Sequence, residues 1–367
     1  MGVYETPNPH HPLGSALLGA ISSELTRFLD SQQESMSAVV TSEMLDLART
    51  FTGGGKRLRP AFCYWGHVAA SGHPADPAGL LRAAASLDLL HVSALVHDDI
   101  IDASDTRRGV PAAHHQFASH HEAMDGRGGD AAFGTAAAIL LGDLLLMWSV
   151  ELFEESRLAP ERMDRARSLL ATMRTEVVCG QYLDVGASFG VTPAESFSAE
   201  LDVANRILEY KTARYSVLRP LQVGAALGGG SAVLEAALAE VGSLVGRAFQ
   251  MRDDVLGVFG DPSVTGKPAG DDLREGKRTV LVLTALGRAD AFRRETLEAL
   301  LGNLDITDVQ LRDGRAIIEA TGALQEAERL IADDTASAVQ LLRDTDMTQE
   351  GRTALVRLAE LSAQRDR

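Results

Sequence analysis

The feature that most constrains the fold of this chain is the spacing of its apolar residues. From Gly14 onward they recur every three or four positions, as at Leu17, Ile21, Leu25 and Phe28, which is the repeat of an amphipathic helix. Long Ala- and Leu-rich segments continue the helical pattern at residues 80–102, 134–153, 194–218 and 233–259. No window shows sustained alternation of β-branched residues, and the breaks are short and marked by Gly and Pro. The sequence therefore predicts an all-α fold.

No low-complexity linker divides the 367 residues, so we predict one large helical domain over residues 14–367. Residues 1–13 are rich in Pro, His and Asn and are predicted to form a flexible N-terminal tail. The segment 134–153 has about the length of a membrane span, but Asp143 lies near its centre and Glu151 near its end. We therefore expect a buried core helix there and no integral membrane segment.

Charge and cysteine content restrict the partners and the compartment. A formal net charge of −16 opposes binding to nucleic acid or to an anionic membrane surface. The two cysteines, Cys63 and Cys179, cannot form a disulfide framework, which fits a reducing environment. The first residues lack the basic region and apolar stretch of a secretory signal. We expect a cytoplasmic protein with no nucleic-acid partner.

Lysine is rare in this chain, with four lysines against 31 arginines. The two residue types are nearly interchangeable on an exposed surface. A lysine that persists in such a chain therefore marks a position that needs a compact, strongly hydrated ammonium group. All four lie in motifs flanked by glycine or acidic residues, and they are Lys56, Lys211, Lys267 and Lys277.

The first acidic cluster follows a mostly apolar helical run. Asp98 and Asp102 are four residues apart, so both carboxylates project from one face of a helix, with Asp99 beside them. Unpaired carboxylates in this position repel one another. A hard divalent cation such as Mg²⁺ resolves the repulsion, because it takes oxygen ligands.

A second acidic cluster, Asp253 and Asp254, follows a comparable apolar helix and is followed in turn by Asp261. Its i+4 position is Gly257 rather than an acidic residue, so this cluster is the poorer chelator on its own. An antiparallel bundle would allow the ends of these two helices to meet, so that both acidic clusters lie at one site.

Basic motifs interleave with the acidic ones. Glycines in such motifs let backbone N–H groups approach an anion, while Lys and Arg supply positive charge. The motifs lie at residues 53–60, 106–109, 211–212, 266–267 and 275–279. Together the acidic and basic motifs predict a site for two polyphosphate anions bridged by divalent metal.

The motifs GGGKRLRP, HDDIID, TRRG, GQYLD, KTA, FQMRDDVLGVFGD and GKPAGDDLREGKRT occur in this order between about residues 50 and 280. In this respect the chain resembles the trans-isoprenyl diphosphate synthases, or polyprenyl synthetases, and most of all the actinobacterial geranylgeranyl diphosphate synthases. The resemblance implies a helical bundle of the isoprenoid synthase type around a central apolar cavity, and a homodimer. It also implies isopentenyl diphosphate and an allylic diphosphate as substrates.

The resemblance also implies a role for each matching residue. Isopentenyl diphosphate is expected to bind at Lys56, Arg59, His91 and Arg108. The allylic diphosphate is expected to bind at Arg107, Lys211, Thr212, Gln250, Lys267 and Lys277. The direct ligands of Mg²⁺ are expected to be Asp98, Asp102 and Asp253. About three Mg²⁺ ions are expected, and Mn²⁺ can substitute for them. Supporting positions are Asp99, Gln181, Asp254 and Asp261. Gly257 departs from the family pattern, in which many members carry a third Asp.

The chemistry of the residues agrees with this assignment. Metal ions and cations aimed at the diphosphate stabilise its departure, and an apolar tunnel keeps water from the carbocation left behind. The expected general base is the released pyrophosphate. A terpene cyclase would lack the Lys56 and Arg59 set, and a regulatory subunit of the same fold would have lost acidic or lysine residues.

Product length is expected to depend on the helical turn before Asp98. Bulky aromatic residues there act in the family as a floor that stops growth at C15, but here the positions hold Ser93 and Ala94. Leu89 and Leu90, one turn further back, could close a deeper pocket. We therefore expect a C20 product, geranylgeranyl diphosphate, with C15 or C25 and longer products as alternatives, and Ser93→Phe is expected to shift the product to C15.

Overall fold

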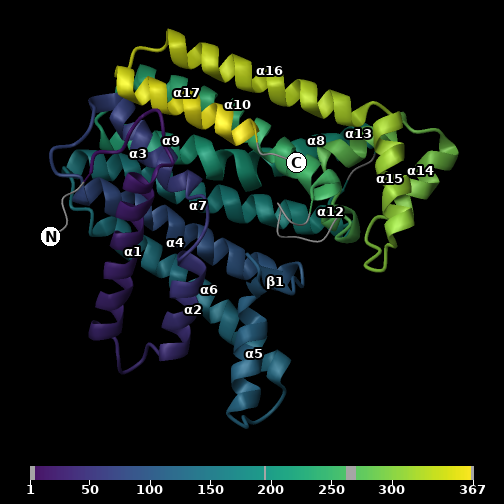
Figure 1. The fold of residues 1–367 in the computed structure, drawn as a ribbon, viewed down its shortest axis with the longest axis horizontal. Coiled ribbons are helices and arrows are strands. Elements are labelled where there is room, and N and C mark those ends of the chain that lie inside the picture. The colour runs from purple at the N-terminus through teal and green to yellow at the C-terminus, as the bar shows by residue number, and fades with distance from the viewer. Residues whose placement is uncertain (1–4, 194–195, 262–269, 365–367) are drawn as a thin grey trace.

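The computed structural model describes residues 5–193, 196–261 and 270–364, and nearly all regular structure in these ranges is helical (Figure 1). The first half of the chain forms α1 (Ser15–Ser35), α2 (Ser42–Thr52), α3 (Leu58–Ser71), α4 (Ala78–Ile101), α5 (Ala113–Ala123), α6 (Asp130–Glu154) and α7 (Pro160–Ser188). The second half forms α8 (Phe197–Ile207), the π-helix η1 (Leu208–Leu218), α9 (Arg219–Leu227), α10 (Ala232–Phe259), α12 (Asp271–Arg274), α13 (Val280–Arg288), α14 (Ala291–Glu298), α15 (Asp308–Ala320), α16 (Ala323–Asp344) and α17 (Gln349–Ala363). The expected all-α fold is confirmed.

The sole sheet in the described residues is a hairpin of β1 (Thr106–Arg107) and β2 (Val110–Pro111), which the sequence analysis did not anticipate. Its two loop residues, Arg108 and Gly109, have φ values of +54° and +78°. Positive φ at both loop positions is the requirement of a type I′ turn, which matches the twist of a two-stranded ribbon. The hairpin follows directly on the end of α4.

The core consists of two clusters of buried apolar side chains. The larger cluster lies among α1 to α7, α9 and the first half of α10, and the smaller lies among α8, α12 to α15 and the second half of α10. Helices α16 and α17 contribute to both, and Figure 1 shows them lying along α10 on one side of the bundle. The two clusters therefore share one continuous layer of helices.

The sequence predicted one helix over residues 194–218, but the structure divides it into α8 and η1. The π-helix lies between α7 and α10 at very short range. A Cβ atom added at Gly180 of α7 would lie 2.4 Å from the backbone nitrogen of Lys211, and one added at Gly246 of α10 would lie 2.5 Å from the Cα of Ala213. Glycine is required at both positions because the backbones approach too closely for any side chain.

Two helices are long and apolar enough to span a membrane by length and composition alone, α4 and α6. The most apolar window of α4 is 78% buried, as in the core helix of a soluble protein. The corresponding window of α6 is only 44% buried. The prediction of a buried core helix at residues 134–153 therefore holds for the face of α6 that packs on α4 and not for its outer face.

The predicted flexibility of residues 1–13 stays a prediction, as does the boundary of the domain at residue 14. In the described part of this segment Pro7 and Pro12 are buried. The indole Nε1 of Trp65 in α3 donates a hydrogen bond of 3.0 Å to the carbonyl oxygen of Pro12. This contact fastens the end of the segment to the core.

Candidate active site

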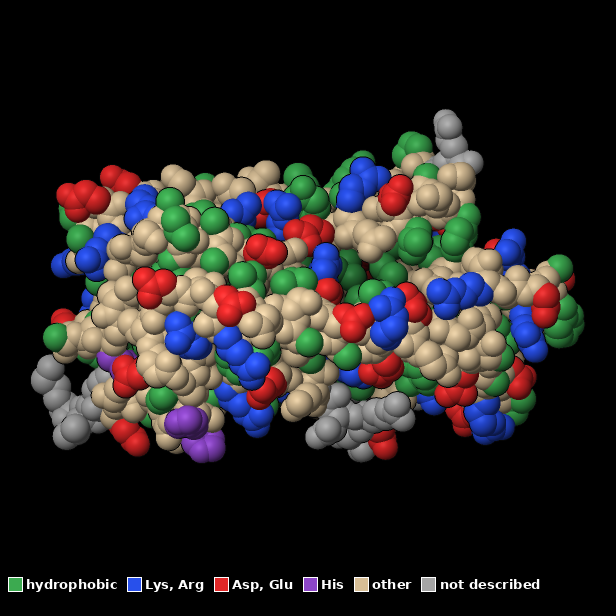
Figure 2. Space-filling model, turned by 90° about the horizontal axis from the view of Figure 1, so that it is seen from above, with side chains coloured by type: hydrophobic (Ala, Val, Ile, Leu, Met, Phe, Trp, Pro, Cys, Tyr) green, Lys and Arg blue, Asp and Glu red, His purple; other side chains and the backbone are tan. Residues whose placement is uncertain are grey.

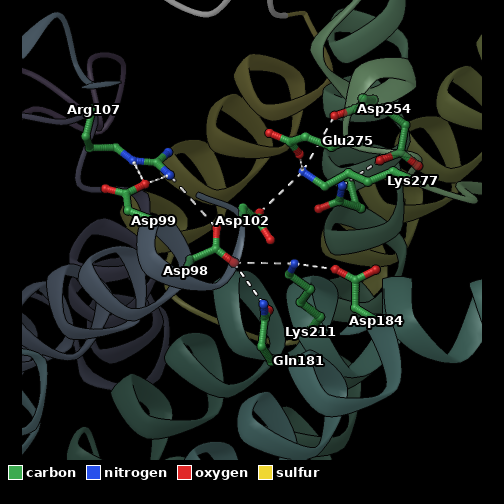
Figure 3. Close-up of polar contacts among 12 residues, drawn as sticks. Asp98, Asp99, Asp102, Arg107, Gln181, Asp184, Lys211, Asp254, Glu275 and Lys277 are labelled. Atoms are coloured by element: carbon green, nitrogen blue, oxygen red, sulfur yellow. Dashed lines mark hydrogen bonds and ion pairs between the residues drawn. The ribbon is translucent and has the colours of Figure 1, made fainter. Parts of the chain in front are cut away.

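The first acidic cluster lies at the C-terminal end of α4 (Figure 3). Asp99 is 1% exposed and accepts a hydrogen bond of 2.8 Å from Arg107 Nε, so it turns inward and holds the β-hairpin. Asp98 and Asp102 are only partly buried. Asp98 Oδ2 lies 3.9 Å from Arg107 Nη2. The carboxylate of Asp99 is thus taken up by Arg107, whereas Asp98 and Asp102 keep carboxylate surface available.

The π-helix η1 places Lys211 opposite Asp98. Lys211 Nζ donates a hydrogen bond of 2.5 Å to Asp184 Oδ2 of α7 and lies 3.7 Å from Asp98 Oδ1. Gln181, one turn before Asp184, donates a bond of 2.9 Å to Asp98 Oδ1. Burial by itself would lower the pKa of Lys211, but the carboxylates of Asp98 and Asp184 outweigh that effect and raise it. Lys211 is therefore a permanent cation.

The second acidic cluster lies near the end of α10, on the other side of the same site. Asp254 is buried and accepts a hydrogen bond of 2.6 Å from Gln250 Nε2. Burial raises the pKa of Asp254 well above its usual range, and the nearby charge of Asp272 raises it further. Asp253 is half-buried on the same turn, so its carboxylate is the more available of the two.

Lys277 joins the two acidic ends. Its Nζ lies 3.8 Å from Asp102 Oδ2 at the end of α4 and 3.7 Å from Asp272 Oδ1 in α12, and it pairs closely with Glu275. Burial opposes the charge of Lys277, yet Asp272, Glu275 and Asp102 together raise its pKa well above the ordinary value. Figure 3 shows Lys211 and Lys277 flanking the end of α4.

The structure gives a reason for glycine at position 257. A Cβ atom added there would lie 2.0 Å from Oδ2 of Asp272, which is 8% exposed. The carboxylate of Asp272 therefore fills the space that a side chain at position 257 would need. The sequence analysis did not single out Asp272, because this contact joins segments fifteen positions apart that no periodicity relates.

The donor set fits a hard divalent cation. Burial raises the pKa of Asp102 and repulsion from Asp98 raises it further, while Lys277 and Lys211 act in the opposite direction. A divalent cation between the two carboxylates would relieve their repulsion. No three of the His, Cys, Asp and Glu side chains in the described ranges converge closely enough to hold a metal ion by themselves. Mg²⁺ commonly reaches a protein through one or two carboxylates, with water and substrate phosphate completing its shell.

A second group of cations lies around the glycine turn that precedes α3. The guanidinium of Arg108 donates 2.9 Å to the Phe51 carbonyl and covers the turn, because a Cβ at Gly55 would lie 2.6 Å from Arg108 Nη2. Gly55 also has a φ of +100°, which favours glycine. A side chain at position 55 would therefore be strained by the backbone conformation and would displace the Arg108 guanidinium.

Arg59 and His91 meet across Tyr215 of η1. The Arg59 guanidinium lies 4.2 Å above the Tyr215 ring and donates 2.7 Å to Ser216 Oγ, and the Tyr215 hydroxyl lies 3.4 Å from His91 Nδ1. Burial, followed by the charges of Arg59, Arg108 and Arg107, lowers the pKa of His91 well below its usual value. His91 is therefore a neutral hydrogen-bonding group.

The remaining predicted residues are placed as follows. Thr212 is half-buried beside Lys211, Lys56 and Asp261 are exposed, and Lys267 lies outside the described residues. Ser93 is buried and donates 2.7 Å to the Gly142 carbonyl of α6, whereas Ala94 is half-buried. Sequence reasoning missed Asp184, although the GQYLD motif places it one turn after Gln181, on the same helix face.

This all-α fold, which gathers two acidic clusters and two half-buried lysines, is the fold of the isoprenoid synthase class. Residues 41–313 match the sequence model of the polyprenyl synthetase family, so the chain belongs to that family of prenyl diphosphate synthases. The expected family is thereby confirmed.

Individual relatives support the same family. The chain is 31% identical over 338 residues to a short chain isoprenyl diphosphate synthase of Methanothermobacter thermautotrophicus, covering 91% of this chain and 94% of that protein. It is 35% identical to a geranylfarnesyl diphosphate synthase of Aeropyrum pernix, over 75% and 79% of the two chains. It resembles a solved geranylgeranyl pyrophosphate synthase of Corynebacterium glutamicum, complexed with isoprenyl diphosphate and magnesium, with TM-score 0.89 and 39% identity over 95% and 99%.

Proposed function

We propose that this chain is a head-to-tail prenyltransferase that condenses isopentenyl diphosphate with allylic diphosphates and forms mainly geranylgeranyl diphosphate. The observation that carries the proposal is the presence of two separate groups of cations. One group lies around Lys211 and Lys277 with the acidic clusters, and the other lies around Arg59 and Arg108. A cyclase, which binds one diphosphate, needs only the first.

The allylic diphosphate belongs to the group with the acidic clusters. Bound Mg²⁺ would neutralise the leaving diphosphate, held at Asp98, Asp102 and Asp253, and we propose about three ions with Mn²⁺ as a substitute. Lys211 and Lys277 remain protonated, so each presents a full positive charge to the departing group. We assign the same diphosphate to Arg107, Thr212, Gln250 and Lys267.

Isopentenyl diphosphate belongs to the second group, at Lys56, Arg59, His91 and Arg108. His91 is neutral, so it fixes the anion by a hydrogen bond while the guanidinium groups supply the charge. The surrounding apolar helices keep water from the carbocation, and the released pyrophosphate is the proposed general base. Each side chain in this second group therefore binds or orients the substrate without accepting a proton.

Product analysis tests the function directly. Purified protein with Mg²⁺, isopentenyl diphosphate and dimethylallyl diphosphate is expected to form geranylgeranyl diphosphate, detected by mass spectrometry. A hydrocarbon formed from one prenyl diphosphate without isopentenyl diphosphate would indicate a terpene cyclase. No turnover by the folded protein would favour a regulatory subunit. A main product of C15, or of C25 and longer, would correct the chain length alone.

The C20 product rests on the small residues before Asp98, and Ala94→Phe tests it. Ala94 lies one turn before Asp98 on the same half-buried face of α4, so a ring there would obstruct a chain growing past this face. We expect the main product to shift to C15, measured by mass spectrometry of the dephosphorylated alcohols.

Ser93→Ala serves as the control for that variant. It removes one hydrogen bond to Gly142 but adds no volume, so its product distribution should stay that of the wild type. A folded, active Ala94→Phe enzyme that still makes C20 would contradict the tunnel assignment. Ser93→Phe keeps its own predicted shift to C15, although Ser93 is buried at the contact with α6.

A second copy of the chain is the proposed partner of α6. Three exposed apolar residues lie seven positions apart on one outward face of α6: Phe133, Leu140 and Met147. The net charge of −16 opposes an anionic membrane as the cover for this face. Figure 2 shows that acidic and basic side chains are interspersed on the face seen from above, without a broad basic field. We propose a cytoplasmic homodimer with no nucleic-acid partner.

Analytical ultracentrifugation of Leu140→Glu/Met147→Glu tests the dimer. Two carboxylates on each copy would face one another at the proposed interface, so we expect the sedimentation of a monomer. Phe292→Glu is the matched control, because Phe292 is 77% exposed on α14, away from α6, and should leave the dimer intact. A monomeric wild type, or a double variant that stays dimeric, would exclude α6 as the interface.

A further inference from the structure

Asp88 is a buried carboxylate that the reaction scheme above does not use. It lies in α4, is 2% exposed, and sits one turn before His91 on the same side of the helix. Its Oδ2 lies 3.4 Å from Arg57 Nε but receives no hydrogen bond within the described part of the chain. A buried carboxylate without full hydrogen bonding is costly unless neighbouring positive charge compensates it.

Arg57 supplies the nearest positive charge and is itself held in an unusual position. It lies between Lys56 and Leu58 at the N-terminus of α3 with a φ of +50°, in the left-handed region that non-glycine residues avoid. Its guanidinium turns inward and donates 2.8 Å to the carbonyl oxygens of Leu18 in α1 and Thr52 in α2. The chain on either side of Arg57 is thereby fixed to three helices, α1, α2 and α4.

The segment that Arg57 fixes is the one that carries the second group of cations. Lys56 is exposed directly before it, and Arg59 lies two residues after it, stacked on Tyr215. Burial raises the pKa of Asp88 to about 6, and the charges of Arg57, Arg108 and Arg59 act in the opposite direction. Asp88 thus pairs with Arg57 and also feels the charges of the two arginines assigned to isopentenyl diphosphate.

We propose that Asp88 is a positioning residue for isopentenyl diphosphate: its carboxylate holds Arg57, and through it the turn that carries Lys56 and Arg59. This inference rests on the proposed function of that turn. It predicts the direction in which the affinity for isopentenyl diphosphate changes when Asp88 is neutralised. Coulomb attraction alone would make an anion bind better once Asp88 is neutralised, because the pocket becomes more positive. Positioning predicts weaker binding, because Arg57 and the turn lose their anchor.

Asp88→Asn tests the proposal, since it removes the charge at nearly constant volume. We expect the KM for isopentenyl diphosphate to rise by roughly tenfold or more, because the turn would no longer hold Lys56 and Arg59 in place. The KM for the allylic substrate and kcat should change less, by about threefold at most. Ser86→Ala is the control: Ser86 is buried on α4 and its hydroxyl donates to the Ala83 carbonyl, so the variant should leave both constants unchanged. An unchanged or lower KM for isopentenyl diphosphate, or an equal rise in both KM values, would overturn the proposal.

Asp88→Glu keeps the charge and provides a second test, including the case in which the asparagine variant does not fold. Its KM for isopentenyl diphosphate should stay within about threefold of the wild type, because the ion pair with Arg57 can re-form. A folded glutamate variant as impaired as asparagine, or impaired by tenfold where asparagine does not fold, would contradict the role of the charge. Calorimetry with isopentenyl diphosphate distinguishes a failure of the proposed function from a failure of this inference. If the wild type does not bind isopentenyl diphosphate, the assignment of the pocket is wrong. If the wild type binds it and Asp88→Asn binds it equally well, only the role of Asp88 is wrong.

Discussion

Asp98→Ala is expected to lower kcat by roughly a hundredfold or more, the largest effect of any single carboxylate in this site. Asp98 lies where three groups from different elements meet: Gln181 donates to it, and Lys211 and Arg107 lie within 4 Å of it, at 3.7 and 3.9 Å. Alanine removes a proposed metal ligand and leaves both cations without this counter-charge. Steady-state rates measured over a Mg²⁺ titration check the result, because a lost ligand also raises the metal concentration needed for half-maximal activity.

Two controls accompany this prediction. Asp333→Ala removes a carboxylate that is 60% exposed on α16 and pairs with Arg329, so its activity should stay that of the wild type. Excess chelator should abolish activity of the wild type, and added Mg²⁺ or Mn²⁺ should restore it. Full activity in chelator, or an Asp98→Ala enzyme that keeps more than about a tenth of wild-type kcat, would refute the metal assignment.

Lys211→Ala is expected to cost roughly a hundredfold in kcat/KM for the allylic substrate, with little change in the KM for isopentenyl diphosphate. Lys56→Ala should show the reverse pattern, because Lys56 lies on the turn before α3 and not beside the acidic clusters. Initial rates with each substrate varied in turn separate the two. Equal effects of both variants on the same substrate would contradict the assignment of two diphosphate sites.

Lys211→Arg should also be impaired by roughly tenfold or more, even though arginine is otherwise the common cation of this chain. The Lys211 ammonium lies 2.5 Å from Asp184, and its backbone is held against Gly180, so a longer planar group has no freedom to withdraw. An arginine variant with wild-type kinetics would show that lysine at this position is not needed.

Much of the fold could be predicted, because burial of one helical face imposes a periodicity that survives in sequence. The acidic pairs of α4 and α10 follow from the same logic, since each pair lies near the end of a long apolar helix. The π-helix could not be predicted in the same way. The repeat of apolar residues over 208–218 does not distinguish a widened helix from an ordinary one, and its close contacts with Gly180 and Gly246 appear only in the folded chain.

The parts of the site that sequence reasoning missed are contacts between distant segments. Asp184 and Asp272 gain their roles from Lys211 and from Gly257, and only the folded chain brings these pairs together. Ser93 was assigned with Ala94 from helical position and from the family resemblance, but a hydrogen bond to the backbone of α6 holds Ser93 in the contact between α4 and α6. The neighbouring helices determine which side of α4 packs against α6. The residue pattern of α4 alone does not contain this information.

The close contact between α7 and the π-helix has a consequence for how this enzyme tolerates mutation. Gly180 carries no functional group, yet any side chain there would displace the backbone of Lys211 and with it the ammonium group. A survey of variants scored by activity would group Gly180 with the charged residues of the site, although it has no side chain with which to touch a substrate. The position of Lys211 thus depends partly on the absence of a side chain at Gly180 of α7. A list of the polar and charged groups in the site would not include this requirement.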